Sequence, residues 1–183
     1  MRGVAALAAV LGLAACGQSE PTPEPAASTA PAGDLVADAL VVVDADGLGA
    51  KGREPLRFGA PREKVDAALA KATGSQPEAS HNEECGAGPM EFSGFGPLQV
   101  GYLDGRLAGW FLGKGEGVAT SDGVVPGATT LELLALEHQV QQLDTTLEGE
   151  FQYTTADYGT ITGFADPDGT ITGLAAGVTC FFR

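Results

Sequence analysis

The chain has 183 residues, 44% of them hydrophobic, which suits one domain with a substantial core. Ten basic residues against 24 acidic residues give a formal net charge of −14. No Lys/Arg cluster occurs along the chain, so this charge argues against nucleic-acid binding and against attraction to anionic lipid headgroups.

The first twenty residues, MRGVAALAAVLGLAACGQSE, have the pattern of an export signal. Arg2 precedes an apolar run that is too short to span a bilayer. Leu13-Ala14-Ala15-Cys16 closely resembles the lipobox of bacterial lipoprotein signal peptides. The resemblance implies that residues 1–15 are removed and that the Cys16 thiol is acylated, which anchors the mature protein in a membrane. The alternative is a plain secretory signal cleaved at another bond.

Residues 16–33 are expected to form the lipidated cysteine and an extended tether. The stretch GQSEPTPEPAASTAPAGD has several prolines and no bulky apolar residue, so it cannot bury enough surface to fold. Gly17 after the cysteine, in place of aspartate, resembles the sorting signal of outer-membrane lipoproteins, which implies the periplasmic leaflet of the outer membrane if the host has two membranes. The folded domain is then residues 34–183.

A glycine-rich stretch follows a predicted strand near residues 39–44. VVVDADGLGAKG, residues 41–52, has the glycines of a dinucleotide-binding turn, but that turn requires a helix to begin at the glycines. Pro55 and Pro61 make such a helix improbable. We therefore interpret Gly47, Gly49 and Gly52 as shaping a connection and not as a phosphate site.

Two helices are predicted from apolar spacing. The first lies within residues 56–74, with Pro61 in its first turn and Gly74 as its C-terminal stop. The second lies within residues 124–143 and begins at a capping box formed by Thr129 and Glu132. Its apolar stripe, Leu133, Leu136, Val140 and Leu143, predicts a face that packs on a sheet and leaves a coiled-coil seam as the alternative.

Antiparallel strands are predicted after each helix. Asp104-Gly105 and Asp168-Gly169 each separate two apolar runs, which is the strongest short-range signal for a β-hairpin. Further strands are expected near residues 89–95 and 150–155. The predicted fold is α+β, with two repeated helix-plus-antiparallel-strand units, about residues 34–117 and 118–183, forming one sheet with helices on one face.

Two short turns at the helix starts carry a resemblance. Gly59-Ala60-Pro61 and Gly127-Ala128-Thr129, together with the two Asp-Gly hairpins, are similar to the tandem α/β units of the β-lactamase-inhibitory protein. They also resemble the small outer-membrane lipoproteins of the barrel-assembly machinery. The resemblance implies a non-catalytic binding fold.

The remaining cysteines, Cys85 and Cys180, are expected to form a disulfide in an oxidising compartment. The competing idea is a metal site made by these two residues with His81 and His138. Neither cysteine has a second ligand at the usual metal-binding spacing, so we predict no metal and no cofactor.

Catalytic and calcium-binding patterns are also weak. His81 and His138 are the only histidines, and Ser93 in EFSGFG lacks the nucleophile-elbow pattern, so no catalytic residue is assigned. DADG at 44–47 and DPDG at 166–169 resemble the start of calcium loops but lack the later glutamate. We interpret both as ordinary hairpin turns.

Aromatic residues cluster in the stretch FSGFGPLQVGYLDGRLAGWF. If one sheet face is uncovered, Tyr102 and Trp110 are the candidates for contact with a protein partner. The overall prediction is a lipid-anchored cell-envelope protein, non-catalytic, that binds another envelope protein or acts as a structural accessory, with no small-molecule ligand. The alternatives are a secreted enzyme inhibitor and an envelope hydrolase with an unfamiliar site.

Overall fold

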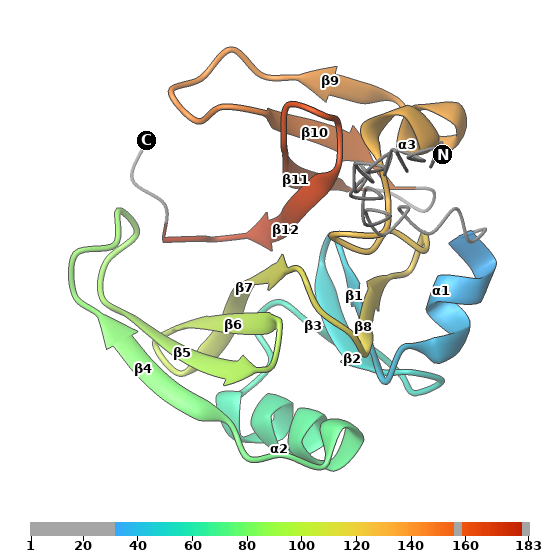
Figure 1. Cartoon of the computed structure of the whole chain (residues 1–183). Coiled ribbons are helices and arrows are strands. Elements are labelled where there is room, and N and C mark those ends of the chain that lie inside the picture. Colours follow the sequence, from blue (N-terminus) through green and yellow to red (C-terminus); the bar gives the residue numbers. More distant parts are fainter. Residues whose placement is uncertain (1–31, 156–158, 181–183) are drawn as a thin grey trace, which may run out of the picture.

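The computed structural model describes residues 32–155 and 159–180, and its regular structure is dominated by two β-sheets (Figure 1). The larger sheet has eight antiparallel strands in the order β4-β5-β6-β7-β12-β11-β10-β9. These are β4 (Glu78–Asn82), β5 (Met90–Phe95), β6 (Leu98–Leu103), β7 (Arg106–Gly113), β9 (Val140–Gln142), β10 (Glu150–Thr154), β11 (Thr160–Ala165) and β12 (Ile171–Gly177). The expected signal peptide and nearly all of the tether lie outside the described residues.

The smaller sheet has four strands in the order β3-β2-β1-β8. They are β1 (Val41–Asp44), β2 (Gly47–Ala50), β3 (Leu56–Arg57) and β8 (Val118–Thr120). β1 pairs in antiparallel fashion with β2 and in parallel with β8, where Val41 lies opposite Val118. Three helices complete the described chain, namely α1 (Ala32–Asp38), α2 (Arg62–Thr73) and α3 (Leu131–Glu137).

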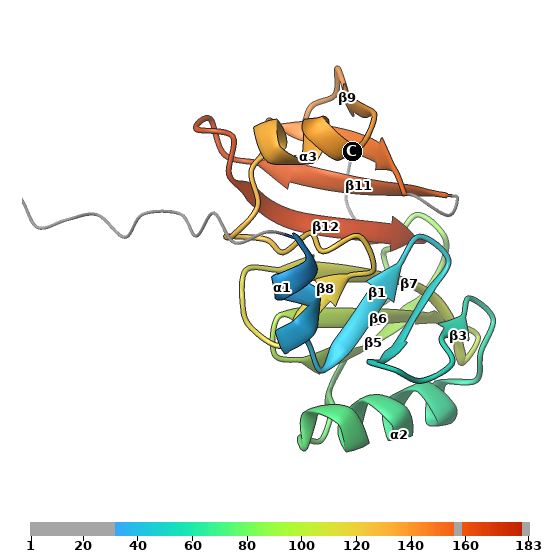
Figure 2. The ribbon, with the colours of Figure 1, turned by 90° about the vertical axis from the view of Figure 1, so that its right-hand side faces the viewer.

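The predicted fold class is wrong. Strands make up 43% of the structure and helices 16%, so the protein is mostly β and is not a repeat of helix-plus-strand units. The expected sheet with helices on one face is replaced by two sheets, because residues 41–57 and 118–120 pair with one another and form a sheet of their own. Figure 2 shows β1 of this second sheet crossing in front of β6 and β7.

The shorter helix α3 shows why the second predicted unit is wrong. α3 ends at Glu137, and Val140, which was expected on its apolar stripe, lies in β9 opposite Tyr153 of β10. Leu134 is the buried side chain of α3, whereas Leu136 is 77% exposed. Pairing with β10 gives the backbone N–H and C=O groups of residues 140–142 their hydrogen-bond partners. This tertiary interaction overrides the helical periodicity of the sequence. Thr130, and not Thr129, is the N-cap, and its side chain accepts from the Leu133 N–H.

Other predicted elements are confirmed. The strands expected near 39–44, 89–95 and 150–155 are β1, β5 and β10. The turn at Asp104-Gly105 joins β6 to β7, and both of its residues have positive φ, 50° and 71°, as a tight two-residue hairpin requires. Asp168-Gly169 joins β11 to β12 in the same role. The helix expected after Pro61 is α2, which ends at the left-handed Gly74.

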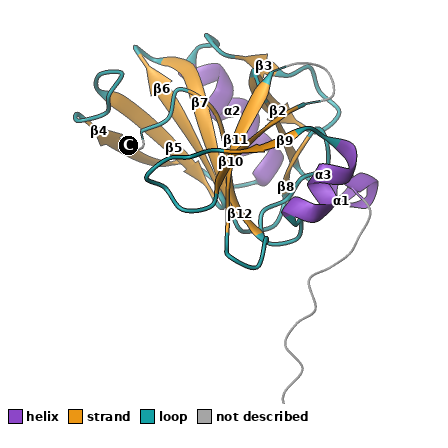
Figure 3. Ribbon diagram, turned by 90° about the horizontal axis from the view of Figure 1, so that it is seen from above, coloured by secondary structure: helices purple, strands orange, loops and turns teal. Residues whose placement is uncertain are grey.

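The main hydrophobic core lies between the two sheets and under α2 and α3. Val41, Val43 and Leu48 of the small sheet pack in one cluster with inward side chains of the large sheet, such as Trp110 and Phe151. The Trp110 indole Nε1–H donates to the Asp44 carbonyl at 2.8 Å and so joins the two sheets. α2 packs against β2, β5 and β7, and Figure 3 shows it between the two groups of strands.

A smaller cluster covers part of the opposite face of the large sheet. After β12 the chain crosses β7, where the Val178 N–H donates to the Ala108 carbonyl at 2.9 Å. A side chain at Gly109 would place its Cβ 2.2 Å from the Val178 carbonyl oxygen, so only glycine permits this crossing. Cys180 then reaches Cys85, and both pack with Met90 and Phe92.

Candidate functional site

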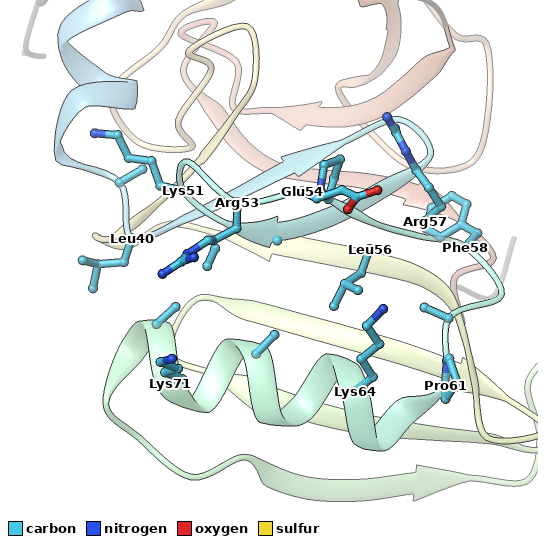
Figure 4. Close-up of a pocket in the computed structure, with 17 residues that line it drawn as sticks. Leu40, Lys51, Arg53, Glu54, Leu56, Arg57, Phe58, Pro61, Lys64 and Lys71 are labelled. Atoms are coloured by element: carbon cyan, nitrogen blue, oxygen red, sulfur yellow. The ribbon is translucent and has the colours of Figure 1, made fainter.

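A groove of about 870 Å³ lies between α2 and residues 49–58, the segment that runs from β2 to the residue after β3 (Figure 4). We call it the α2 groove. Its volume is in the range of small-molecule binding sites. Most of its lining is apolar or small, and its rim carries charged side chains from both walls. These charged residues are Lys51, Arg53, Glu54, Arg57, Lys64 and Lys71.

The helical wall follows from the spacing of residues along α2. Lys64, Ala68, Lys71 and Ala72 line the groove and recur at steps of 4, 3 and 1, so they share one face of the helix. Val65 and Leu69 lie on the neighbouring, inward face and are fully buried in the core. One face of α2 is therefore fixed by packing, and this leaves the alanine and lysine face at the surface.

The sheet wall depends on two of the glycines that the sequence singled out. A Cβ at Gly47 would lie 2.3 Å from the Leu56 carbonyl oxygen, and one at Gly49 would lie 3.3 Å from the Pro55 Cα. The absence of side chains lets residues 54–57 lie directly against β2, where Leu48 pairs with Leu56. Gly47 and Gly49 thus lie in β2, with no helix beginning at them, and shape one wall of the α2 groove.

The groove concentrates positive charge on a strongly acidic chain. Lys51, Arg53, Arg57, Lys64 and Lys71 are five of the ten basic residues of the whole sequence, and the rim has one carboxylate, that of Glu54. Summed over the groove, five positive charges and one negative charge leave a local excess of four, against −14 for the chain. Such a concave cationic site attracts anions that the rest of the surface repels.

Two of the five cations are already engaged. Arg57 forms an ion pair with Asp46, and the Lys51 ammonium donates to the Ala37 carbonyl at the end of α1. Within the described part of the chain, Arg53, Lys64 and Lys71 have no ion pair and no side-chain hydrogen bond. Their charges face solvent and are the ones available to a bound anion.

A polar network holds α2 in place behind the groove. The Asp66 carboxylate accepts from the Tyr102 hydroxyl at 2.7 Å, from the Ser93 hydroxyl at 3.1 Å and from Arg62 Nε at 3.2 Å. Arg62 also pairs with Glu91 at 2.8 Å and lies over the Tyr102 ring, 5.2 Å from its centre. The helix is thereby tied to β5 and β6, which fixes the position of the groove's helical wall.

Two buried tyrosines are expected to make the stability of the fold depend on pH in the alkaline range. Burial raises the pKa of the Tyr102 hydroxyl far above its usual range, and the Asp66 carboxylate raises it further. Burial raises the pKa of Tyr153 as well, helped by the charges of Asp122 and Asp44. Because the folded pKa exceeds that of the unfolded chain, the unfolded state loses protons first as pH rises.

We therefore expect the free energy of unfolding to be insensitive to these tyrosines below about pH 10 and to fall progressively above it. Urea unfolding of the wild-type protein and of a Tyr102→Phe/Tyr153→Phe variant, measured across this range, checks the prediction, since the variant should lose less stability as pH rises. Tyrosinate absorbance is the second readout. Ionisation of both side chains near their ordinary pKa without unfolding contradicts it.

The predicted site residues are the three cysteines and two aromatic side chains. Cys85 and Cys180 form the predicted disulfide, with their Cα atoms 5.0 Å apart. Cys16, the predicted lipidation site, lies outside the described residues. Tyr102 and Trp110, the candidates for partner contact, are 0% and 1% exposed. Because the small sheet and α2 cover this face, neither ring is available to a partner at the surface.

Neither histidine lines the α2 groove. His81 is exposed in β4, and His138 follows α3, where its Nδ1 lies 3.2 Å from the Thr154 carbonyl. The calcium-loop candidates DADG and DPDG are both hairpin turns, and one carboxylate of each pairs with a cation: Asp46 with Arg57, and Asp166 with Lys114. In residues 32–155 and 159–180, no group of three or more potential metal ligands is found. Nor does any helix in these ranges have the length and hydropathy to cross a membrane.

Sequence reasoning missed the α2 groove because its cations come from separate segments. A signal was nevertheless present, since Lys64, Ala68, Lys71 and Ala72 already share a face of the predicted helix.

Comparison of the chain with protein-family models, with curated proteins and with solved structures found no match.

Proposed function

We propose that this chain is a lipid-anchored protein of the cell envelope that binds an anionic component of that compartment in the α2 groove. The observation that carries the proposal is the groove itself. It gathers half of the chain's basic residues around an apolar floor, although the chain as a whole carries a charge of −14. A concave, mostly apolar site with a few converging charges is the usual form of a ligand-binding site.

The anchor is supported by the use of the cysteines. Cys85 and Cys180 are bonded to each other, which leaves Cys16 as the one cysteine for acylation. A disulfide between residues 95 positions apart also suits an exported protein, because cytosolic thiols are kept reduced. In this proposal the acyl chains hold Cys16 in the membrane, and residues 17–31 act as the tether. The expected tether boundary at residue 33 moves to residue 31, because α1 begins at Ala32.

Binding, and not catalysis, is the proposed activity. The groove brings cations and short apolar side chains together, and neither His81 nor His138 lines it. A positively charged groove can hold and orient an anion without any proton transfer or covalent step. The proposal therefore assigns the protein a carrier or accessory role in the envelope.

The anchor is tested by changing the acylated residue. Cys16→Ser is expected to move the protein from the membrane fraction to the soluble fraction and to remove the mass of the acyl chains from the intact protein. A Cys85→Ala/Cys180→Ala variant is the matched control, since it also removes cysteines but keeps Cys16, and it should remain in the membrane fraction. A wild-type protein that is soluble and unacylated would overturn the anchor.

A further inference from the structure

We propose that the α2 groove is a site for an elongated organic anion that carries a negative charge at each end of an apolar body, of which a linear dicarboxylate is the simplest example. This ligand class rests on the proposed function, in which the groove is the binding site. It follows from how the free cations and the apolar side chains are distributed along the groove.

Positive charge lies at both ends of the groove. Figure 4 shows Arg53 and Lys71 at the end near Leu40, and Lys64 at the other end, near Pro61. Lys64 and Lys71 are seven residues apart on α2, which corresponds to about 10 Å along the helix axis. A single small anion cannot reach both ends, whereas an anion of that length with two charged groups can.

The floor of the groove between its two ends is apolar, and the Glu54 carboxylate lies above Leu56 on the sheet wall. Leu56 points from the sheet wall toward α2, and Ala68 is the lining residue of the helix that lies between Lys64 and Lys71 in the sequence. Neither side chain can donate a hydrogen bond. A ligand with polar groups at its centre would lose its hydration there without replacement partners. An apolar centre instead buries surface from water and gains about 25 cal/mol for each Å² removed.

The charges match a dianion better than a monoanion. Arg57 is paired with Asp46, and Lys51 with the end of α1, so Arg53, Lys64 and Lys71 are the cations left for the ligand. Glu54 is the one carboxylate on the rim, and it repels an anion placed beside it. Charge at both ends of the ligand neutralises Lys64 at one end and the Arg53/Lys71 pair at the other. Because these side chains are exposed, binding should weaken as salt is raised.

The test is equilibrium dialysis of radiolabelled decanedioate against the full chain in neutral phosphatidylcholine vesicles, with empty vesicles as the blank. Three competitors each lack one property of decanedioate. Decanoate lacks one end charge, butanedioate lacks the length, and 1,10-decanediol lacks both charges. We expect decanedioate to bind at least tenfold more tightly than any of the three. Equal binding of decanoate, or of butanedioate, overturns the two-ended site.

Single charge reversals locate the site. Lys64→Glu and Lys71→Glu should each lower the affinity for decanedioate at least tenfold, because each removes the partner at one end. Lys114→Glu is the matched control: Lys114 is also exposed, it lies outside the groove and pairs with Asp166, and its reversal changes the net charge equally. If Lys114→Glu lowers the affinity as much as the groove variants, the effect is one of overall charge and the proposal is wrong.

Two further outcomes distinguish this ligand class from a membrane contact and from the proposed envelope anchor. If the groove lysines are instead required for binding to phosphatidylglycerol vesicles, and decanedioate does not compete, the groove is a membrane contact and the ligand class is overturned. If decanedioate fails to bind an acylated, membrane-bound protein, the ligand class fails while the envelope anchor stands. Lys64→Gln and Lys71→Gln repeat the test without introducing new negative charge.

Discussion

Reduction of the Cys85–Cys180 disulfide is expected to lower the free energy of unfolding by about 4 to 5 kcal/mol. The bond joins residues 95 positions apart, so it removes a large loop-closure entropy from the unfolded chain. It also holds the chain after β12 across β7 and against the region that follows β4. Urea unfolding with and without a thiol reductant measures the loss directly.

Substitution separates the cross-link from the packing of the sulfur atoms. Cys85 is buried beside Met90 and Phe92, so Cys85→Ala/Cys180→Ala should lose the cross-link and also some packing. It is expected to be slightly less stable than the reduced wild-type protein and to be insensitive to reductant. A loss on reduction below about 1 kcal/mol would show that the bond does not constrain the unfolded chain in the expected way.

Asp66→Ala is expected to cost about 3 kcal/mol, because it leaves the Tyr102 and Ser93 hydroxyls without their acceptor. The Asp66 side chain is 19% exposed, so water replaces only part of what is lost. Tyr102→Phe removes one bond of the network and should cost about half as much. Urea unfolding of the two single variants and of the double variant gives the coupling between the two side chains.

This network also links stability to the α2 groove. In Asp66→Ala the amides of α2 should exchange hydrogen faster relative to those of β6 and β7, because the helix loses its tie to the large sheet. Lys64→Glu, on the opposite side of the helix, should leave exchange unchanged. Uniform acceleration across both sheets would mean that Asp66 supports the whole fold and not the position of α2.

The groove variants and the stability variants therefore report on different properties. Lys64 and Lys71 lie at the surface and are expected to alter ligand affinity with little effect on unfolding. Asp66 and the disulfide do not line the groove, so substitutions there are expected to lower the free energy of unfolding. If the proposed ligand class is correct, affinity follows the charge of the groove's two ends and not the stability of the domain.

Features governed by neighbouring residues were predicted correctly from the sequence. The helix after Pro61 and the two Asp-Gly hairpins depend on turn and capping chemistry within a few residues, and all are present. The Cys85–Cys180 pair followed from the small number of cysteines. The buried aromatic residues were misjudged as partner contacts, because the alternation of a strand does not say which face another sheet will cover.

The amino-acid sequence alone was enough to predict the position of α2, the two hairpin turns, the disulfide pairing and the acidic charge of the chain. Tertiary contacts, in contrast, produce the second sheet, the end of α3 at Glu137 and the meeting of Arg53 with Lys64 and Lys71 in one groove. The first set depends on local backbone preferences and on counting residues. The second depends on contacts between distant segments, such as β1 with β8, whose free energy is gained only when the whole core is assembled.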